Sequence, residues 1–378
     1  MCNILFVVRT PYQLIVATKI VMQFHNNDSI DLIIGNSIAE VDVLVQKVKD
    51  TKIFHNVSMM DMKGFRADRN YWKVQVKQNC AQRFLNTKPS LISDIIFNNY
   101  NKVYIANIDE ISNIICCQAL LESNGRQAEL CLYEDGFSTY SNFYGEYFNK
   151  NENKIKNKFN LKRNIIQLSL KYSMPNYLQK IKSLYVFRPN LLDWKPKFKI
   201  VEIPKIAIDD IEYKQALKDI FDYENSEDIY DKEYIFFEES YFADGKEIND
   251  VDIVKKIADI VGKENLMVKI HPRNRVNRFK ELGYKTNVNT YIPWEVIAQN
   301  IDLSNKTLIT IASGAVIVPL INMSAKPRKI IMLIDTKEIK EIEMSNKRRC
   351  IHNTVKKIAL ANGRDIELLS STFQGMKQ

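Results

Sequence analysis

NILFVVRTPYQLIVATKIVMQF, residues 3–24, decides the fold. Its short apolar run Ile4–Val8 predicts a strand, and the mixed stretch Tyr12–Gln23 predicts a helix. The polar residues from Arg9 to Gln13 then stand where a strand ends and a helix begins. The same alternation of short apolar runs and longer mixed stretches recurs along the chain, which is typical of βαβ units and predicts an α/β protein.

The alternation predicts two parallel-sheet domains, because 378 residues exceed the size at which one core stops growing, roughly 250–300 residues. Prolines gather between Tyr172 and Ile206, where long regular elements are disfavoured. We therefore expect an N-terminal domain at 1–190 and a C-terminal domain at 191–378. Strands are expected at Ile4–Val8, Asp31–Ile34, Val103–Ala106, Glu129–Tyr133, Tyr234–Phe237, Leu266–Ile270, Leu308–Ile311 and Lys329–Leu333. Helices are expected at Tyr12–Gln23, Ile38–Val48, Ile111–Leu121, Val251–Val261, Trp294–Gln299 and Ala315–Met323.

The composition is that of a globular protein, with 46% hydrophobic and 26% charged residues. Apolar runs are too short or too interrupted for a membrane span, and the N-terminus does not resemble a signal peptide, so a cytoplasmic protein is expected. The six cysteines show no C-x-x-C pair and the four histidines are scattered singly, which gives no metal-ligand spacing.

The net charge of +9 comes mostly from one stretch, residues 150–182, which holds nine lysines and arginines against the single acid Glu152. Apolar residues alternate with these charges. The segment is interpreted either as a basic amphipathic surface that binds an anionic membrane or an acidic polymer, or as the solvated face of a connecting helix. No nucleic-acid-binding motif accompanies it, so nucleic acid is not expected as a partner.

Unusual polar residues follow several of the predicted strands. Glu134, Asp135 and Gly136 follow Glu129–Tyr133, and two adjacent carboxylates repel each other and resist burial. A carboxylate whose pKa is raised by such surroundings is suited to removing a proton from a sugar hydroxyl, while an acidic turn without function is the alternative. Because C-terminal ends of parallel strands gather at one sheet edge, functional groups are expected there.

VKIHPR, residues 268–273, places His271 just beyond a strand end with Pro272 behind it. Lys269 and Arg273 flank the histidine with positive charge. Such a histidine can donate a proton to a departing phosphate near neutral pH, although a surface histidine with satisfied hydrogen bonds is an equal alternative.

Two further stretches stand at predicted helix starts. In LITIASGAVIVP, Ser313 occupies an N-cap position and Gly314 lets a ligand approach backbone N–H groups, so a phosphate site and a plain cap are both open. In YIPWEV, Glu295 falls in the first turn, where it complements the helix dipole and could also accept ribose hydroxyls.

Asp250-Val251-Asp252 matches the D-x-D pattern of metal-dependent glycosyltransferases. Because Asn249 precedes it and a helix follows, we interpret it as capping and dipole complement. Neither a dinucleotide-binding glycine fingerprint nor a P-loop is present in the sequence.

In this order, the stretches resemble those of the bacterial sialyltransferases, with the lipooligosaccharide sialyltransferases (glycosyltransferase family 52) as the nearest match and the polysialyltransferases and marine-type enzymes as kin. Those groups share an acidic-acidic-Gly motif, a His-Pro motif and a serine motif at a helix start. The serine motif here is Ser313-Gly314-Ala315. Thr10, Gln13 and IPWEV add to the resemblance, which spans roughly residues 4–330.

The resemblance implies a GT-B fold with two Rossmann-like domains facing a central cleft, CMP-sialic acid as donor and no metal or other cofactor. It implies that His271 protonates the leaving phosphate, that Ser313 and Gly314 hold it, and that Glu295 binds the ribose. Lys269, Pro272, Arg273 and Ala315 complete the expected donor site in 191–378. Thr10, Gln13, Asn107 and Gly136 form the expected acceptor side in 1–190.

The catalytic base stays open at this point. The polysialyltransferases and marine-type enzymes imply Glu134, supported by Asp135, and we take the two as a catalytic pair. The lipooligosaccharide enzymes imply an acid on the loop FFEESYFADG, where Glu239 or Asp244 can fill the place.

The expected function is therefore an inverting, metal-independent sialyltransferase that caps a terminal galactose of a capsular polysaccharide or lipooligosaccharide, with segment 150–182 at the inner membrane face. Two alternatives stay open. One is a transferase of the same fold that uses another nucleotide sugar, and the other is a non-catalytic binder of nucleotides or acidic polysaccharides.

Overall fold

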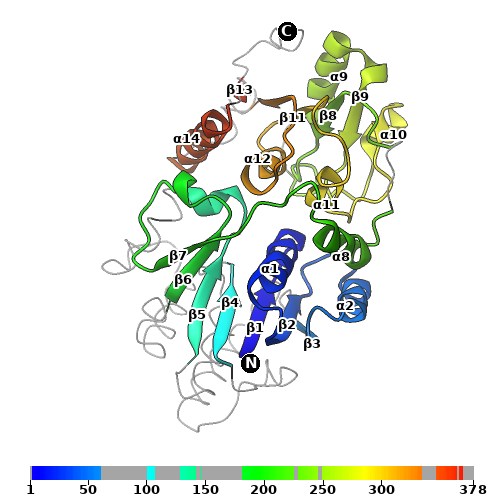
Figure 1. The fold of residues 1–378 in the computed structure, drawn as a ribbon. Coiled ribbons are helices and arrows are strands. Elements are labelled where there is room, and N and C mark those ends of the chain that lie inside the picture. Colours follow the sequence, from blue (N-terminus) through cyan, green and yellow to red (C-terminus); the bar gives the residue numbers. More distant parts are fainter. Residues whose placement is uncertain are drawn as a thin grey trace, which may run out of the picture. The chain divides into compact units, whose positions relative to one another are not determined.

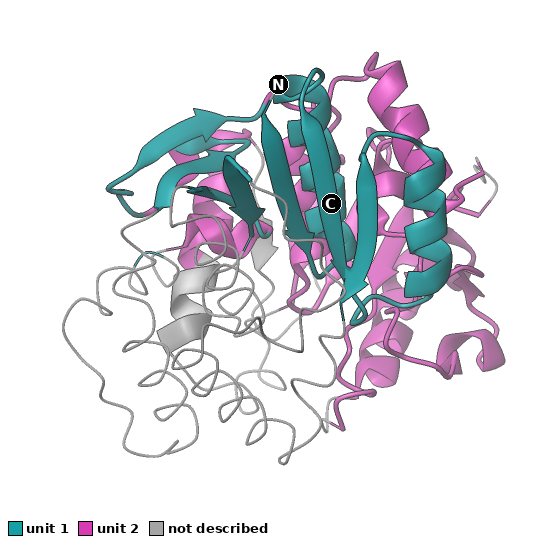
Figure 2. Cartoon of the chain, turned by 90° about the horizontal axis from the view of Figure 1, so that it is seen from below, with its two compact units in different colours: residues 1–135, 144–189, 194–203 teal, residues 136–143, 190–193, 204–378 magenta. Residues whose placement is uncertain are grey.

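A computed structural model of the chain describes residues 2–60, 100–106, 128–141, 145, 181–224, 229–245, 249–333, 346–363 and 366–368. These residues form two compact units, coloured teal and magenta in Figure 2. The predicted helix Ile111–Leu121, the predicted acceptor-side residue Asn107 and nearly all of the basic segment 150–182 lie outside the described residues.

The first unit is built on a parallel sheet of seven described strands in the order β3-β2-β1-β4-β5-β6-β7 (Figure 1). Every pair in it is parallel, as the alternating sequence predicts. The strands are β1 (Asn3–Val8), β2 (Ser29–Gly35), β3 (Asn56–Met60), β4 (Lys102–Ile105), β5 (Glu129–Tyr133), β6 (Ile181–Val186) and β7 (Lys199–Glu202), with helices α1 (Pro11–Phe24) and α2 (Val41–Asp50).

Strand β1 lies between β2 and β4 and is buried from Ile4 to Val8. A strand covered on both faces has no polar face to show, which explains why its sequence is an unbroken apolar run. Helix α1 starts directly after it: the Thr10 hydroxyl caps the Gln13 amide, and Pro11 occupies the first turn, where its missing N–H costs nothing. The predicted strand and helix are confirmed.

The second unit contains a parallel sheet of six described strands in the order β10-β9-β8-β11-β12-β13. Its strands are β8 (Tyr234–Phe237), β9 (Leu266–Lys269), β10 (Lys285–Thr286), β11 (Thr307–Thr310), β12 (Lys329–Met332) and β13 (Ile366–Leu368). Its helices are α8 (Ile211–Phe221), α9 (Asp250–Val261), α10 (Arg278–Glu281), α11 (Trp294–Ala298), α12 (Val318–Asn322) and α14 (Asn346–Ala361), with the 3-10 turns η2 (Phe137–Tyr140), η4 (Pro189–Leu191), η5 (Lys263–Asn265) and η6 (Gly314–Val316) in the chain.

The helix predicted at Ala315–Met323 divides into two short pieces, η6 and α12. Pro319 lies in the first turn of α12, where its fixed φ suits a new helix start but its ring disfavours continuation of a preceding one. The dipole at Ser313 is therefore that of a three-residue 3-10 turn and not of a long helix.

The units divide the chain differently from the expected boundary at residue 190. Residues 136–143 and 190–193 belong to the second unit, and the first unit continues to Ile203. Strands β6 and β7 both lie within the proline-rich stretch between Tyr172 and Ile206. They form there because they have only six and four residues and fit between successive prolines. Among the described residues, Cys2 and Cys131 are free thiols, and no helix is both long and apolar enough to span a bilayer.

Candidate active site

The first unit places an acid pair at the end of β5. Glu134 is 0% exposed, and both of its carboxylate oxygens are engaged. Oε1 accepts from the Tyr12 hydroxyl at 2.5 Å, and Oε2 accepts from the Phe187 backbone amide at 3.1 Å. Glu134, at the end of β5, is therefore hydrogen-bonded to the segments that follow β1 and β6.

Asp135 is more open than its neighbour. Its side chain is partly exposed, and Oδ1 accepts from Gln13 Nε2 at 2.8 Å. Gln13 is itself buried, and its Oε1 accepts from the Arg9 amide at 2.7 Å. The structure thus brings the predicted residues Thr10 and Gln13 to the acid pair, although they are separated from it by more than a hundred positions in the chain.

Gly136 has φ 78° and ψ −166°, a conformation that is essentially restricted to glycine. It turns the chain out of β5 and caps η2, whose first residue, Phe137, lies against Gly314 of the second unit. A Cβ at Gly314 would overlap the Phe137 ring, so this glycine is required by close packing within the second unit.

The second unit gathers cationic groups at the end of β9. Lys269 is 6% exposed, and burial lowers its pKa to about 8 while the charge of Glu295 acts in the opposite direction. His271 is partly buried. Burial, followed by the charges of Arg273 and Lys269, lowers the pKa of His271 to about 4, so the imidazole is neutral at pH 7.

The tautomer of His271 follows from its hydrogen bond. Nδ1 accepts from the Arg273 amide at 3.1 Å, so in the neutral ring Nε2 carries the proton. The Arg273 guanidinium is exposed and binds Asp244 at 2.9 Å and the Ser240 hydroxyl at 2.6 Å. Pro272 lies exposed between the two residues.

Glu295 lies in the first turn of α11, which begins at Trp294 after Pro293, as predicted, and it is partly exposed. Burial raises its pKa, while its own backbone amide and the charge of Lys269 lower it. Burial, followed by the charges of Asp210 and Glu295, also raises the pKa of Tyr213, a buried residue of α8 that was not predicted from the sequence. The charges of Lys269 and Glu295 therefore act on each other, and each favours the charged form of its partner.

Ser313 caps η6 with its hydroxyl, which accepts from the Ala315 amide at 3.3 Å. Its own amide donates to the Thr310 hydroxyl at 3.0 Å. Strand β8 lies between β9 and β11, so the loops that carry His271 and Ser313 emerge two strands apart at the same sheet edge.

The alternative acids on the loop after β8 are both engaged. Glu239 Oε1 accepts from the Thr310 hydroxyl at 3.1 Å and from the Ala312 amide at 2.9 Å. Asp244 accepts from Arg273 and from the Ser240 hydroxyl at 2.7 Å. Each of these carboxylates is hydrogen-bonded to residues of the second unit's own loops.

The D-x-D stretch is a helix start, as interpreted from the sequence. Asn249 caps α9 by accepting from the Asp252 amide, and Asp250 is buried against Arg278 at 2.8 Å. Within the described ranges, no group of three His, Cys, Asp or Glu side chains is placed to hold a metal ion.

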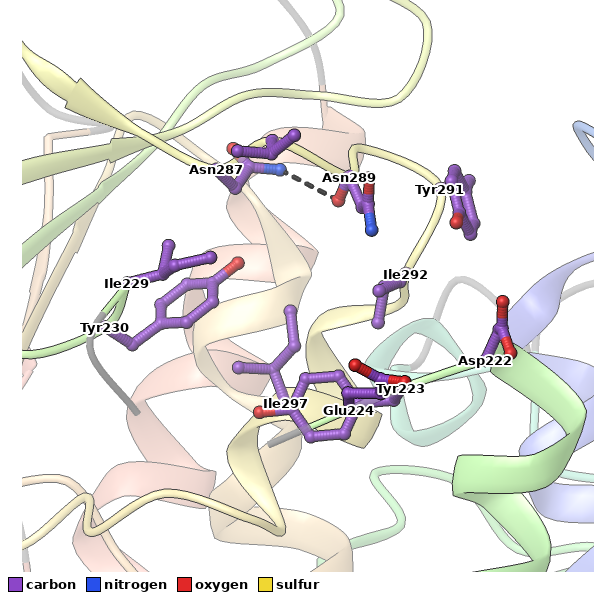
Figure 3. A pocket seen from close by; sticks show the side chains of 11 residues that line it. Asp222, Tyr223, Glu224, Ile229, Tyr230, Asn287, Asn289, Tyr291, Ile292 and Ile297 are labelled. Carbon is purple, nitrogen blue, oxygen red and sulfur yellow. Dashed lines mark hydrogen bonds between the residues drawn. The ribbon is translucent and has the colours of Figure 1, made fainter. Parts of the chain in front are cut away.

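A cavity of about 370 Å³ opens elsewhere in the second unit, beside the C-terminal end of α8 (Figure 3). Its lining residues are Asp222, Tyr223, Glu224, Ile229, Tyr230, Asn287, Val288, Asn289, Tyr291, Ile292 and Ile297. None of the predicted site residues lines it. The loop 287–292 on its wall leads into α11, and the Asn287 side chain donates to the Asn289 carbonyl, the bond drawn in Figure 3.

Several residues that contact the predicted site residues were not predicted from the sequence. Tyr12, Glu238, Asn287 and Phe137 belong to no motif by themselves. Tyr12 had the clearest signal, since it lies between Thr10 and Gln13 in a polar stretch at a strand end.

Comparison with known proteins gives one family match. The sequence model described as alpha-2,8-polysialyltransferase matches residues 4–318. A search of curated protein sequences finds no match. The predicted kinship with bacterial sialyltransferases is confirmed, and the matching model is that of the polysialyltransferases.

One solved structure shows the same fold. An alpha/beta-galactoside alpha-2,3-sialyltransferase from Photobacterium phosphoreum superposes with a TM-score of 0.52 at 13% identity, covering 96% of this chain and 98% of that one. The S. aureus MnaA structure with UDP has a TM-score of 0.47 at 13% identity, covering 95% and 88%. The predicted GT-B class, with two Rossmann-like domains, is confirmed.

Proposed function

The chain belongs to the alpha-2,8-polysialyltransferase family, and on that premise we propose that it moves sialic acid from CMP-sialic acid to a glycan acceptor with inversion, without a metal. The observation that carries the proposal is the pair Lys269 and His271, one buried cation and one neutral imidazole at the same strand end. An anionic leaving group is the ligand for which such a pair is suited.

The acid is His271. In the proposed complex its Nε2–H donates to a phosphate oxygen of the donor, and the negative charge of the phosphate raises the pKa of the imidazole. With the pKa raised, Nδ1 takes a second proton in place of its hydrogen bond from the Arg273 amide. As the bond between the sialyl carbon and the phosphate oxygen breaks, this oxygen takes the Nε2 proton of the imidazolium, CMP leaves, and the ring returns to its neutral form. Lys269 and the Ser313 loop contribute the electrostatic stabilisation that a divalent cation supplies in other transferases.

The base is the acid pair, and the geometry favours Asp135 as the member that takes the proton. Asp135 is the more exposed carboxylate, while Glu134 is buried with both oxygens engaged. The acceptor hydroxyl attacks the sialyl carbon from the face opposite to CMP and gives its proton to Asp135. This reverses the emphasis of the sequence analysis, which gave Glu134 the leading role in the pair.

The acceptor is proposed to be a capsular polysaccharide or lipooligosaccharide end. Terminal galactose is the acceptor that the sequence analysis proposed, and the alpha-2,8 description of the family adds a sialic acid terminus as a second acceptor to test. We propose Thr10, Gln13 and Asn107 as its contacts, because the first two lie beside the acid pair.

The test is CMP release from CMP-sialic acid with galactose- and sialic acid-terminated acceptors, with the product linkage determined by NMR. We expect release that His271→Ala lowers about 10²-fold, while His55→Ala, which changes an exposed histidine of the first unit, does not affect it. Turnover of a different nucleotide sugar with none of CMP-sialic acid would support the alternative donor. Binding of the donor without turnover would support the non-catalytic alternative.

We also propose that segment 150–182 holds the enzyme on the inner membrane face, because its excess of lysine and arginine suits anionic lipid headgroups. Binding to anionic vesicles at low salt, weakened by added salt, is expected. Equal binding to neutral vesicles, or none to anionic ones, would remove this role.

A further inference from the structure

Two consecutive glutamates directly follow β8, the strand between β9 and β11. Glu238 is 2% exposed, and its Oε2 accepts from the backbone amide of His271 at 3.0 Å. Its other oxygen, Oε1, accepts from Arg278 at 2.9 Å. The carboxylate therefore holds the backbone of the residue that carries the imidazole, and it does so from the neighbouring strand.

Glu239 makes the matching contact on the opposite side. Its Oε1 accepts from the Ala312 amide at 2.9 Å and from the Thr310 hydroxyl at 3.1 Å. The same Thr310 hydroxyl accepts from the Ser313 amide at 3.0 Å. One carboxylate oxygen is thus linked directly to the Ala312 amide and, through the Thr310 hydroxyl, to the Ser313 amide.

We propose that Glu238 and Glu239 are positioning residues that fix the separation between the His271 loop and the Ser313 loop for the donor phosphate. The inference rests on the proposed function, since it assigns these loops to the donor. β9, β8 and β11 are adjacent in the sheet. Two carboxylates at the end of β8 can therefore hold the loops that follow both β9 and β11. Positioning of this kind is worth a large factor in rate, since a misplacement of about 1 Å can cost about 10²-fold.

The remaining contacts of Glu238 make it a rigid anchor. Arg278 binds both Glu238 and Asp250, whose side chain is 1% exposed, so the buried negative charges have a shared cation. The guanidinium also lies over the Phe242 ring, 4.1 Å from its centroid. From the other side of β9, Asn287 Oδ1 accepts from the Ile270 amide at 2.6 Å. The His271 loop is therefore held from both flanking strands.

The two glutamates differ in how many acceptor atoms these bonds use, and this difference gives the test. The bonds of Glu239 with Ala312 and Thr310 use Oε1 alone, so Glu239→Gln keeps an acceptor for both and Glu239→Ala does not. Glu238 uses both oxygens, so Glu238→Gln replaces one acceptor by an NH₂ group that cannot accept from either partner. Glutamine is expected to substitute at position 239 and to fail at position 238.

At position 239, the measurement is steady-state CMP release with CMP-sialic acid varied. We expect Glu239→Ala to raise the donor KM about tenfold, because it removes a charged hydrogen-bond acceptor behind the phosphate loop. Glu239→Gln should restore KM to within about threefold of wild type. If Glu239 were instead the catalytic base, Glu239→Gln would lose kcat as fully as Glu239→Ala, which would overturn the positioning role.

At position 238, we expect Glu238→Gln to lower kcat about 10²-fold with the donor KM nearly unchanged, because the imidazole is displaced while the phosphate loop is intact. Amide hydrogen exchange at residue 271 should become faster in this variant. If Glu238→Gln does not fold, the Glu239 pair decides the question by itself.

Glu233→Gln is the matched control. Glu233 precedes the other end of β8 and is paired with Arg328 at the surface, so its loss should change neither kcat nor KM. Failure of wild-type enzyme to release CMP would contradict the proposed function. Normal wild-type activity together with normal kcat and KM in Glu238→Gln and Glu239→Ala would contradict only the inference made here.

Discussion

The end of β5 in the first unit and the end of β9 in the second bury charges of opposite sign. In the first unit, the carboxylate of Glu134 is wholly buried between hydrogen-bond donors, and Asp135 lies partly exposed beside it. In the second, Lys269 is buried and His271 partly so, and the pKa values of both are lowered by burial. The end of β5 thus presents carboxylates, and the end of β9 presents basic groups.

The proposed function assigns a different part of the chemistry to each of these two strand ends. A partly exposed carboxylate can take a proton from a neutral hydroxyl, and a desolvated cation gains most from an anionic ligand. The acceptor should therefore depend on the first unit's cluster and the donor on the second's. The predictions below separate these two dependences.

The largest effect is expected at the acid pair. Asp135→Asn should lower sialyl transfer about 10³-fold, because an amide cannot take the acceptor proton. Glu134→Gln should have a smaller effect, since Gln retains one of the two acceptor oxygens. Transfer is measured with saturating donor, and calorimetric CMP binding serves as the control, which both variants should retain. A greater loss in Glu134→Gln than in Asp135→Asn would return the leading role to Glu134.

The next effect concerns the acid. His271→Ala should lower CMP release about 10²-fold, because the leaving phosphate is no longer protonated. In the wild type, the imidazole pKa, followed by NMR, should rise from about 4 when CMP binds, since a bound anion favours the charged ring. A pKa that does not change with CMP would place the phosphate away from His271.

A pH dependence of about tenfold is expected from Lys269. Its pKa is lowered to about 8, so as the pH rises through 8 the ammonium loses its proton and its attraction for the donor phosphate. The donor KM should increase about tenfold from pH 7 to pH 9. Lys269→Arg retains its charge over this range and should give a flat profile. A flat profile in the wild type would remove Lys269 from the donor site.

A stability effect is expected from Gly314→Ala. The added methyl group overlaps the Phe137 ring, and overpacking of this kind costs about 1–3 kcal/mol of unfolding free energy. Thermal unfolding measures it, and Phe137→Leu in the same chain should recover part of the loss. Phe137→Leu that gives no recovery would show that the ring is not the obstacle.

The smallest effect is expected from the D-x-D stretch. Asp252 is exposed in the first turn of α9, and Asp252→Asn should leave transfer within about twofold, as should treatment with EDTA. Loss of activity with EDTA that is restored by a divalent cation would contradict the metal-independent mechanism.

The strands could be predicted from the sequence because parallel strands covered on both faces are unbroken apolar runs. β8 has the predicted bounds, β9 and β12 end one residue earlier than predicted, and β11 is shifted by one residue at both ends. α8 was missed although its buried residues, from Tyr213 to Phe221, recur with helical spacing. β7 was missed because most of its side chains are exposed.

The strand-end positions of Glu134, His271 and Ser313 were also predictable, because the strands before them were. Their partners were not, because a hydrogen bond such as that from Tyr12 to Glu134 joins residues 122 positions apart and leaves no local pattern. The same holds for Glu238 and Asn287, which are common residues in ordinary surroundings. Long-range contacts of this kind come from the sheet order.

The interleaving of the two units along the chain has a consequence for biosynthesis. Every segment of the first unit has been made once Ile203 is synthesised, but the earlier residues 136–143 and 190–193 belong to the second unit. Asp193 binds Thr354 and Lys357, which are translated more than 150 residues later. At roughly 5–20 residues per second, these two loops wait on the order of ten seconds or more for their partners. A ribosome that pauses in this interval would hold the nascent chain with one unit ready to fold and the other without its sheet.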